Sequence, residues 1–167
     1  MKKAHKGVLY AGVFLCLTHV SMAKDGFSLG GVVALDNKHV GGGFEVGFPL
    51  LQKGFTIRNY ISVFAYAAEN TNSLLLLQEK ITFGGARDSN MARLYGFISG
   101  SFGLTMQEQK DMFKSPFAWE GFIGGGADIS GGEYASVFIE AGGGISGDTL
   151  GVMQGFGRIQ VGFRGFF

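Results

Sequence analysis

Cysteine and histidine are scarce in this chain of 167 residues. It has a single cysteine, Cys16, and three histidines, of which only His39 follows the first 23 residues. One cysteine cannot form an intramolecular disulfide, so a disulfide framework is excluded. We expect Cys16 to be removed with a leader, which excludes thiol catalysis as well. Because one histidine and no cysteine would then remain, the sequence predicts neither a Cys/His metal site nor a cofactor.

Long apolar runs and an excess of positive charge are also missing beyond residue 23. No run of 18 apolar residues occurs there, so the sequence predicts no transmembrane helix. Residues 24–167 hold 11 basic and 13 acidic side chains, because three of the 14 basic residues lie nearer the N-terminus. Such a balance provides no polybasic surface, and we therefore do not expect nucleic acid as a partner.

The first 23 residues have the three parts of a secretory signal peptide. A segment with three lysines precedes a mainly apolar stretch over residues 7–20, and Ser21-Met22-Ala23 is a small-x-small cleavage site. The alternative is a membrane anchor, but this stretch is shorter than the roughly 20 apolar residues of a spanning helix. We expect cleavage after Ala23, export, and a single domain over residues 24–167.

Glycine and phenylalanine, by contrast, are abundant. The chain has 30 glycines and 17 phenylalanines, and its mean hydropathy is positive at +0.23. Glycine at this level disfavours helices. A hydrophobic, exported chain that is poor in helix formers indicates strands in contact with lipid.

Residues 155–167, GFGRIQVGFRGFF, alternate most clearly. Read in steps of two, one set contains Phe167, Phe163, Val161 and Ile159 together with glycines, and has no polar side chain. The other set holds both arginines of the segment. Because a period of two places the sets on opposite faces of a strand, one face is apolar and the other carries all the charge.

Seven further segments alternate in the same way, each near the ~9–11 residues with which a tilted strand crosses a bilayer. They cover residues 27–35, 40–48, 55–67, 74–85, 93–105, 117–129 and 133–145, and polar turn residues separate them.

Two positions conflict with the pattern. We expect Pro49 to end the pairing of the second segment. Glu79 falls on the apolar face of the fourth, which predicts either a place near a membrane interface or a bulge in the leucine run 74–77.

An alternating strand that closes on Phe167 resembles the terminal strand of bacterial outer-membrane β-barrels. Over residues 24–167 the eight segments are similar to those of the small eight-stranded members of that family, such as the transmembrane domain of outer membrane protein A. The resemblance implies an all-β fold, an eight-stranded antiparallel up-and-down transmembrane β-barrel. It also implies a place in the bacterial outer membrane.

The resemblance further implies partners. They are the lipid bilayer, with lipopolysaccharide or another outer-leaflet lipid, and the barrel assembly machinery, which reads a signal in the terminal strand. That signal would comprise Ile159, Val161, Phe163 and Phe167. We expect a monomer whose outward loops follow the odd-numbered strands, over residues 36–39, 69–72, 107–115 and 147–154.

Alternation also assigns nine charged residues to the inner face. They are Glu45, Arg58, Lys80, Arg93, Glu120, Asp128, Glu140, Arg158 and Arg164. The interior of an eight-stranded barrel is just wide enough for side chains to fill it, and buried charges must be paired. The four acids and five bases therefore predict an interior ion-pair network that plugs the barrel. The alternative is a gated or leaky pore lined by the same residues.

Several functions remain open from the sequence. The leading hypothesis is a structural or surface-interaction protein, and the alternatives are a small channel or, if the faces are reversed, a secreted lipocalin-like carrier of an apolar ligand. A lipid-modifying enzyme would need a histidine with a serine and an acid at the rim. His39 lies near Asp36, but no signature pairs a serine such as Ser73 with it, so we expect no enzymatic activity.

Overall fold

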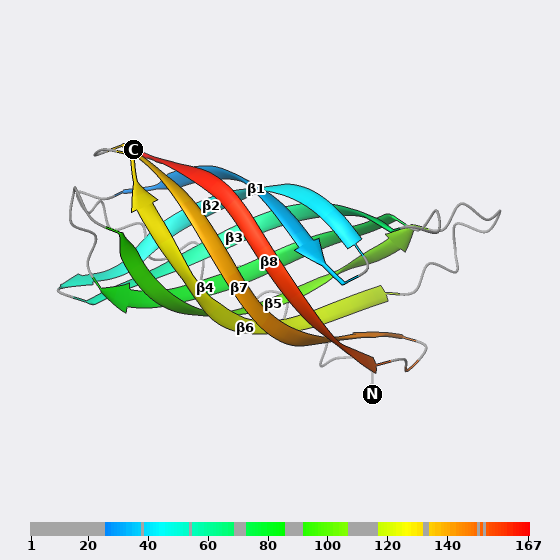
Figure 1. Cartoon of the computed structure of the whole chain (residues 1–167). Coiled ribbons are helices and arrows are strands. Elements are labelled where there is room, and N and C mark those ends of the chain that lie inside the picture. The colour runs from blue at the N-terminus through cyan, green and yellow to red at the C-terminus, as the bar shows by residue number, and fades with distance from the viewer. Residues whose placement is uncertain are drawn as a thin grey trace, which may run out of the picture.

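The computed structural model describes residues 26–37, 39–53, 55–68, 73–85, 92–106, 117–131, 134–149, 151 and 153–167. Eight strands account for nearly all of them (Figure 1): β1 (Ser28–Asp36), β2 (His39–Lys53), β3 (Phe55–Ala68), β4 (Ser73–Gly85), β5 (Arg93–Met106), β6 (Phe117–Ser130), β7 (Ala135–Asp148) and β8 (Met153–Phe166). The predicted leader, residues 1–23, and the predicted loops 69–72 and 107–115 lie outside the described residues. No helix within the described ranges is long and apolar enough to cross a membrane.

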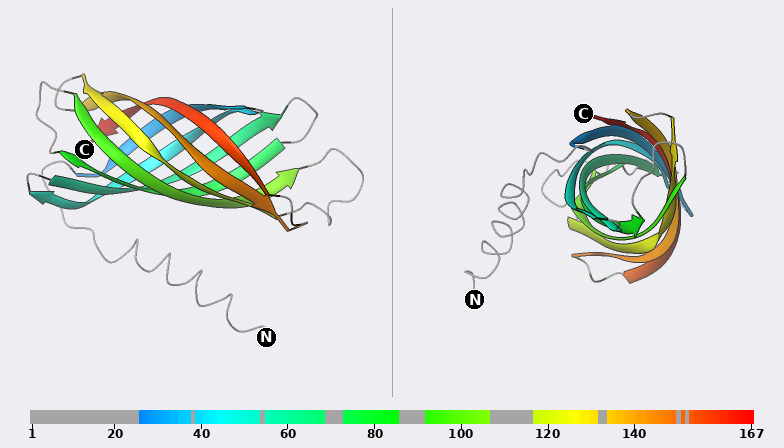
Figure 2. Two further views of the ribbon diagram at one scale, coloured as in Figure 1. Left: turned by 60° about the horizontal axis from the view of Figure 1, so that its bottom comes forward. Right: turned by 90° about the vertical axis from the view of Figure 1, so that its left-hand side faces the viewer.

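The eight strands form one closed sheet. Each strand pairs antiparallel with its neighbours in the chain, and β1 pairs antiparallel with β8. The end-on view shows the resulting ring (Figure 2). Because the strand number is even, the start of β1 and the end of β8 meet at one rim, where the Phe167 amide donates to the Phe27 carbonyl at 2.9 Å. The prediction of an eight-stranded antiparallel up-and-down barrel is confirmed.

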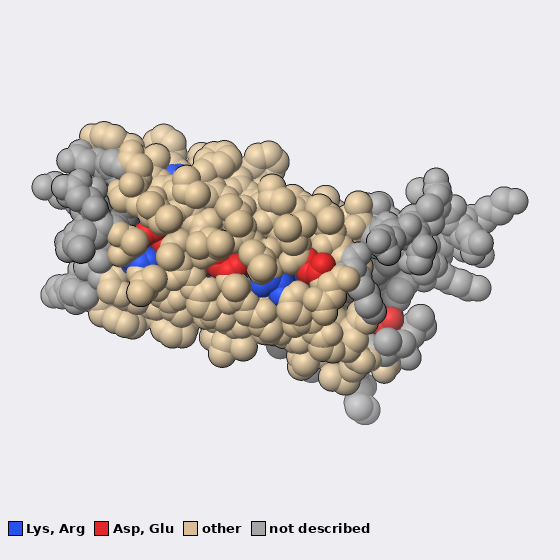
Figure 3. All heavy atoms as spheres, viewed as in Figure 1, with Lys and Arg blue, Asp and Glu red and all other residues tan. Residues whose placement is uncertain are grey.

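Alternation decides which residues face inward. Along β1 the side chains alternate between buried and more exposed positions, and the same two-residue period runs through β7. Outward positions carry the large apolar side chains, and one view of the surface shows mainly uncharged atoms with charged atoms at only a few places (Figure 3). The barrel therefore has an apolar exterior and a charged interior.

Pro49 does not end the pairing of β2, and that prediction was wrong. The strand continues to Lys53 and pairs with β3 on both sides of the proline. The register shifts between Pro49 and Leu51, which is a β-bulge. Proline has no amide hydrogen to donate to the ladder, and a bulge is one of the places where a strand tolerates this.

Glycines in β2 make room for aromatic side chains of β3. The register pairs Gly41 with Tyr66, Gly43 with Phe64 and Gly47 with Tyr60. A Cβ added at Gly41 would lie 2.3 Å from a ring carbon of Tyr66, and one at Gly47 would lie 2.5 Å from a ring carbon of Tyr60.

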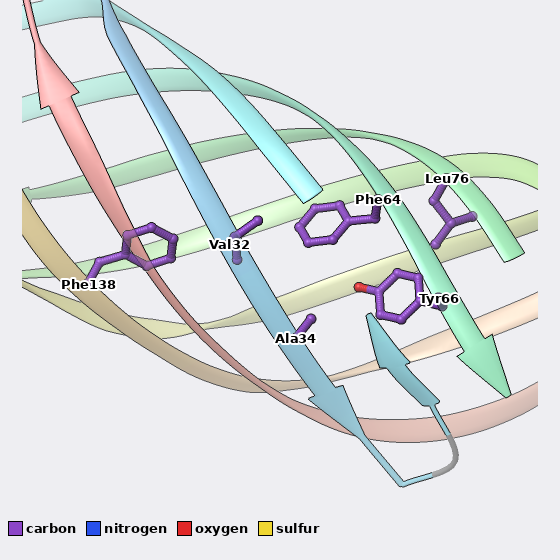
Figure 4. Packing of buried hydrophobic residues seen from close by; sticks show 6 residues of the cluster. All are labelled: Val32, Ala34, Phe64, Tyr66, Leu76 and Phe138. Atoms are coloured by element: carbon purple, nitrogen blue, oxygen red, sulfur yellow. The ribbon is translucent and has the colours of Figure 1, made fainter. Parts of the chain in front are cut away.

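The inward aromatic side chains join other apolar residues in two clusters. One cluster, seen from close by in Figure 4, comprises Val32, Ala34, Phe64, Tyr66, Leu76 and Phe138. The other comprises Tyr95, Phe97 and Phe122, with Phe156 packed against it. The charged side chains of the interior therefore lie among rings and aliphatic groups.

Candidate functional site: the charged interior

All nine charged residues that the sequence assigned to the inner face are buried. They come from β2 to β8, and the pairing register brings them into two groups of contacts. The central network comprises Glu45, Lys80, Arg93, Tyr95, Asp128, Glu140 and Arg164. The outer network comprises Asp36, Glu120 and Arg158. The contacts of Arg58 are described separately below.

Arg164 of β8 is the hub of the central network. Its Nε donates to Glu45 of β2, one terminal nitrogen lies 2.6 Å from Asp128 Oδ1 on β6, and the other lies 3.0 Å from Glu140 Oε1 on β7. A guanidinium group presents its donors in a rigid fork, so one side chain can contact several carboxylates at once. Arg164 thereby links four strands across the interior.

Lys80 of β4 provides the second cation of this network. Its Nζ lies 2.8 Å from both oxygens of Glu140 and 3.3 Å from Glu45 Oε2. The Tyr95 hydroxyl donates to Glu140 Oε1 at 2.7 Å and accepts from Arg164 at 3.2 Å. Glu140 is thus contacted by two cations and a hydroxyl while being fully buried.

Aromatic rings flank Arg164 and Lys80. The guanidinium carbon of Arg164 lies 3.7 Å from the ring centroid of Phe138 and 4.3 Å from that of Tyr60. Lys80 Nζ lies 5.2 Å from the ring centroid of Tyr60 and 5.3 Å from that of Phe138. A cation over a ring face is attracted by the ring quadrupole, and the attraction increases when water is excluded.

Two arginines extend the charged interior toward the rim where the chain termini meet. Arg93 lies 3.6 Å from Asp128 and donates to the Thr82 hydroxyl at 3.3 Å. Arg58 donates to the Gly26 carbonyl at 2.9 Å, and its guanidinium carbon lies 5.1 Å from the ring centroid of Phe166.

The outer network lies nearer the opposite rim. Arg158 of β8 forms a bidentate ion pair with Glu120 of β6, in which its two terminal nitrogens lie 2.9 Å and 3.0 Å from the carboxylate oxygens. One of these nitrogens also lies 3.3 Å from Asp36 Oδ2. The rings of Phe156 and Tyr66 lie 4.6 Å and 4.9 Å from its guanidinium carbon. Paired hydrogen bonds between arginine and a carboxylate are among the strongest in proteins.

Asp36 is the interior residue that sequence reasoning missed. It was assigned to a polar turn, yet its side chain is only 6% exposed and contacts Arg158. Alternation contained the signal, because Asp36 continues the inward set of Val32 and Ala34. With Asp36 included, the interior charges named here comprise five acids and five bases.

His39 is tied to the same aspartate. Its backbone amide donates to Asp36 Oδ1 at 2.8 Å, and its ring Nδ1 lies 3.0 Å from the same oxygen. This arrangement joins the end of β1 to the start of β2 and links both to the outer network through Arg158. Within the described ranges, no three residues of the His, Cys, Asp or Glu types are placed to hold a metal ion.

Glu79 lies on the outer face in the middle of β4. Of the two explanations offered by the sequence, the bulge was wrong, and a place near a membrane interface stays a prediction. The register of β4 with β3 and β5 is continuous, so the leucine run contains no bulge. Glu79 is the seventh of 13 residues, so it is far from either end of the strand. Asn59 of β3, also on the outer face, donates to Glu79 Oε1 at 3.0 Å.

The four residues assigned to an assembly signal share the outer face of the closing strand. Ile159, Val161 and Phe163 are exposed on β8, and Phe167 is exposed just beyond it. Phe163 pairs with Gly31 of β1 and Val137 of β7, and its ring covers Gly31. An apolar surface of this kind faces lipid in a transmembrane barrel.

Comparison with solved structures supports the fold. Neither a protein-family model nor a curated protein matches the chain. The N-terminal β-barrel domain of Pseudomonas aeruginosa OprF matches 86% of this chain and 98% of its own, with 16% identity and a TM-score of 0.58. A structure described as de novo design of transmembrane β-barrels matches 87% of this chain and 98% of its own, with 10% identity and a TM-score of 0.54. The outer membrane enzyme PagL gives 16% identity, 82% and 97% coverage, and a TM-score of 0.43. The fold is thus that of small eight-stranded transmembrane β-barrels.

Proposed function

We propose that this chain is an integral protein of the bacterial outer membrane with a structural or surface-interaction role, and that its interior is closed by ion pairs. The observation that carries the proposal is the sidedness of the wall. Ten charged side chains point inward and contact one another or neighbouring polar and aromatic groups, while large apolar side chains point outward. The apolar outer side of such a wall is suited to contact with lipid, and the side chains on its inner side fill the interior of the barrel.

The ion pairs support a closed interior. Arg164 alone joins strands from opposite parts of the ring, and the aromatic clusters occupy space between the charged groups. Moving such a group to open a path would break several contacts of a buried charge, which is costly. A small channel is the competing function, and it requires these pairs to exchange partners or separate.

The same sidedness argues against a secreted carrier of an apolar ligand. A lipocalin-like protein would hold apolar side chains inside and turn its charges to water. Here Arg158 and Arg164 are buried, whereas Phe44 and Phe163 are exposed. As a membrane protein the chain would contact the bilayer and an outer-leaflet lipid such as lipopolysaccharide, and the assembly machinery would read β8.

We further propose that the protein is not an enzyme. His39 is the residue that a rim hydrolase would require, and its ring contacts Asp36, which itself contacts Arg158. These contacts support a role for His39 in ordering the turn. A lipid hydrolysis assay with the wild-type chain and His39→Ala tests this, because activity lost in the variant would contradict the proposal.

Two measurements on residues 24–167 test membrane insertion and closure separately. The chain is folded into detergent micelles and run on a denaturing gel before and after boiling. A compact, faster band that shifts on boiling is expected of a closed membrane barrel, and a chain that stays soluble without detergent and shows no shift would contradict it. In planar bilayers the folded chain should produce no sustained conductance, whereas steady ion flow would favour the channel.

A further inference from the structure

Two glutamines lie on the inner face between the central and outer networks. Gln160 of β8 is 1% exposed; it follows Arg158 of the outer network and precedes Arg164, the hub of the central network. Gln78 of β4 is 2% exposed and is the inward residue next to Lys80 of the central network. Because side chains on one face of a strand recur at every second residue, each amide occupies an inward position beside a buried cation.

Neighbouring strands add hydroxyl groups at the same level. Gln78 pairs in register with Ser62 of β3 and with Ser101 of β5. The Ser101 hydroxyl donates to Glu120 of the outer network at 3.3 Å, and the Gln78 amide nitrogen donates to the Ser99 hydroxyl at 3.3 Å. Uncharged polar groups of β3, β4, β5 and β8 therefore form a layer that separates the two networks.

The protein leaves much of the hydrogen-bonding capacity of this layer unused. Within the part of the chain that the structure describes, Ser62 Oγ and Gln78 Oε1 form no hydrogen bond with a protein group. The Gln160 amide has at most the Tyr66 hydroxyl as a direct partner, although a carboxamide offers two donor hydrogens and an oxygen with two lone pairs. Buried polar groups in native proteins nearly always have a partner, so these atoms indicate a bound molecule.

Water suits these groups better than an ion does. Hydroxyl and carboxamide groups both donate and accept, so the layer has no preference for a cation or an anion. The charged groups nearest to it already have partners, since Glu140 contacts Lys80 and Arg164, and Glu120 contacts Arg158. A buried water molecule typically makes about three hydrogen bonds to polar groups of this kind.

Aromatic rings flank the layer toward both rims. Three ring centroids lie 5.2–5.9 Å from Lys80 Nζ, those of Tyr60, Phe97 and Phe138. Three others lie 4.6–5.6 Å from the guanidinium carbon of Arg158, those of Tyr66, Phe122 and Phe156. A small molecule held between these two groups of rings should exchange slowly with the surrounding water.

We propose that this layer, formed by Ser62, Gln78, Ser99 and Gln160, binds long-lived water molecules that hydrogen-bond to its unused polar atoms. The inference deepens the proposed closed interior and rests on it, because the ion pairs then close the barrel on both sides of water that is bound and does not flow. A direct bond between the two glutamine amides after a change of rotamer, with no water, is the competing arrangement.

Water contacts of the glutamine side chains test the proposal in the wild-type sequence. Residues 24–167 are prepared with isotope-labelled glutamine, folded in detergent micelles and studied by NMR experiments that separate contact with water from proton exchange. The carboxamide groups of Gln78 and Gln160 should each show strong cross-peaks with long-lived water. Gln154 is exposed near the start of β8 and should show only the weak signal of freely moving water.

A filling substitution shows whether the water occupies this layer. Ser62→Leu adds apolar volume while leaving both glutamines in place, so it should expel the water and abolish the cross-peaks of Gln78 and Gln160. Val63→Leu is the matched control, because Val63 is the next residue of β3 and is 49% exposed on the outer face. It should leave the cross-peaks unchanged. The heat-dependent gel shift shows whether each variant has folded, and if Ser62→Leu does not fold, the wild-type spectra decide.

The outcomes separate this inference from the proposed function. If Gln78 and Gln160 show no water cross-peaks in a folded chain that does not conduct, the bound water alone is overturned and a direct bond between the amides is favoured. Cross-peaks that persist in folded Ser62→Leu also overturn it, because the water then lies elsewhere. Signals of freely moving water at both glutamines, together with steady conductance, overturn the closed interior as well.

Discussion

Glu79 and Lys80 are adjacent in β4, yet they lie on opposite sides of the barrel wall and in opposite surroundings. Lys80 is buried and contacts Glu140 and Glu45 at 2.8 Å and 3.3 Å. Glu79 is exposed on the outer face, where Asn59 donates a hydrogen bond to it. The comparison shows that Lys80 lies between two carboxylates on the inner face, whereas the outer-face neighbours of Glu79 are the apolar Ile61 and the uncharged Asn59. Charge should therefore stabilise the barrel inside and contribute little or nothing outside.

The largest effect is expected when the central network loses one acid. Glu140→Ala removes the partner of Lys80 and Arg164 and leaves both cations buried with fewer contacts. Breaking a buried pair from one side costs about 3–5 kcal/mol. Urea unfolding of the barrel in lipid vesicles should show a loss of that size. A loss below about 1 kcal/mol would mean that water reaches this network freely.

A somewhat smaller effect is expected in the outer network. Arg158→Ala leaves Glu120 and Asp36 without their cation, and it removes the side chain over Phe156. Glu120 lies nearer a rim and can be hydrated when Arg158 is removed. We therefore expect the free energy of unfolding to fall by about 2–3 kcal/mol, which is no more than the lower end of the range for a broken buried pair. The same unfolding measurement should rank this variant between Glu140→Ala and the wild type. A larger loss than in Glu140→Ala would reverse the proposed order of the two networks.

Glycines extend the comparison from charge to packing. Gly41→Ala points a methyl group into the Tyr66 ring, where the new Cβ would lie 2.3 Å from a ring carbon. Overpacking of this kind typically costs about 1–3 kcal/mol. Gly100→Ala on the outer face meets nothing within 4 Å and serves as the control. Equal stability of the two variants would show that the ring of Tyr66 moves aside without cost.

The smallest effect is expected outside the barrel. Glu79→Leu replaces a carboxyl group on the outer face by an apolar side chain. Charged groups on the lipid-facing side of a membrane barrel destabilise it, at the bilayer midplane, by about 2–4 kcal/mol for basic residues and by less for acidic ones. Part of that gain is offset by the lost bond to Asn59, so stability should stay the same or rise by about 1 kcal/mol. Urea unfolding in lipid vesicles is the suitable measurement, and a loss above 1 kcal/mol would contradict the account.

The sequence predicted the architecture because a period of two is a local property of the chain. Eight alternating segments are enough to assign strands, sidedness and the nine buried charges. Pro49 was the exception in β2, since a bulge depends on how the partner strand continues and not on the proline itself.

The pairing of charges could not be predicted in the same way. Arg164 contacts Glu45, Asp128 and Glu140, which lie 24 to 119 positions away in the chain. These contacts depend on the register of every strand between them and on the closure of β1 against β8. Asp36 was missed for a different reason: turn composition was given more weight than the alternation that continued through it.

The exposure of two neighbouring valines to lipid would test the central claim most directly. Val32 is 4% exposed inside the barrel and Val33 is 55% exposed on the outer face. With methyl-labelled valine in lipid nanodiscs, a paramagnetic agent dissolved in the lipid should broaden the NMR signals of Val33 and leave those of Val32 sharp. Broadening of Val32 with Val33 unaffected, or broadening of Val33 by a water-soluble agent alone, would show that the faces are reversed or that the wall does not meet lipid.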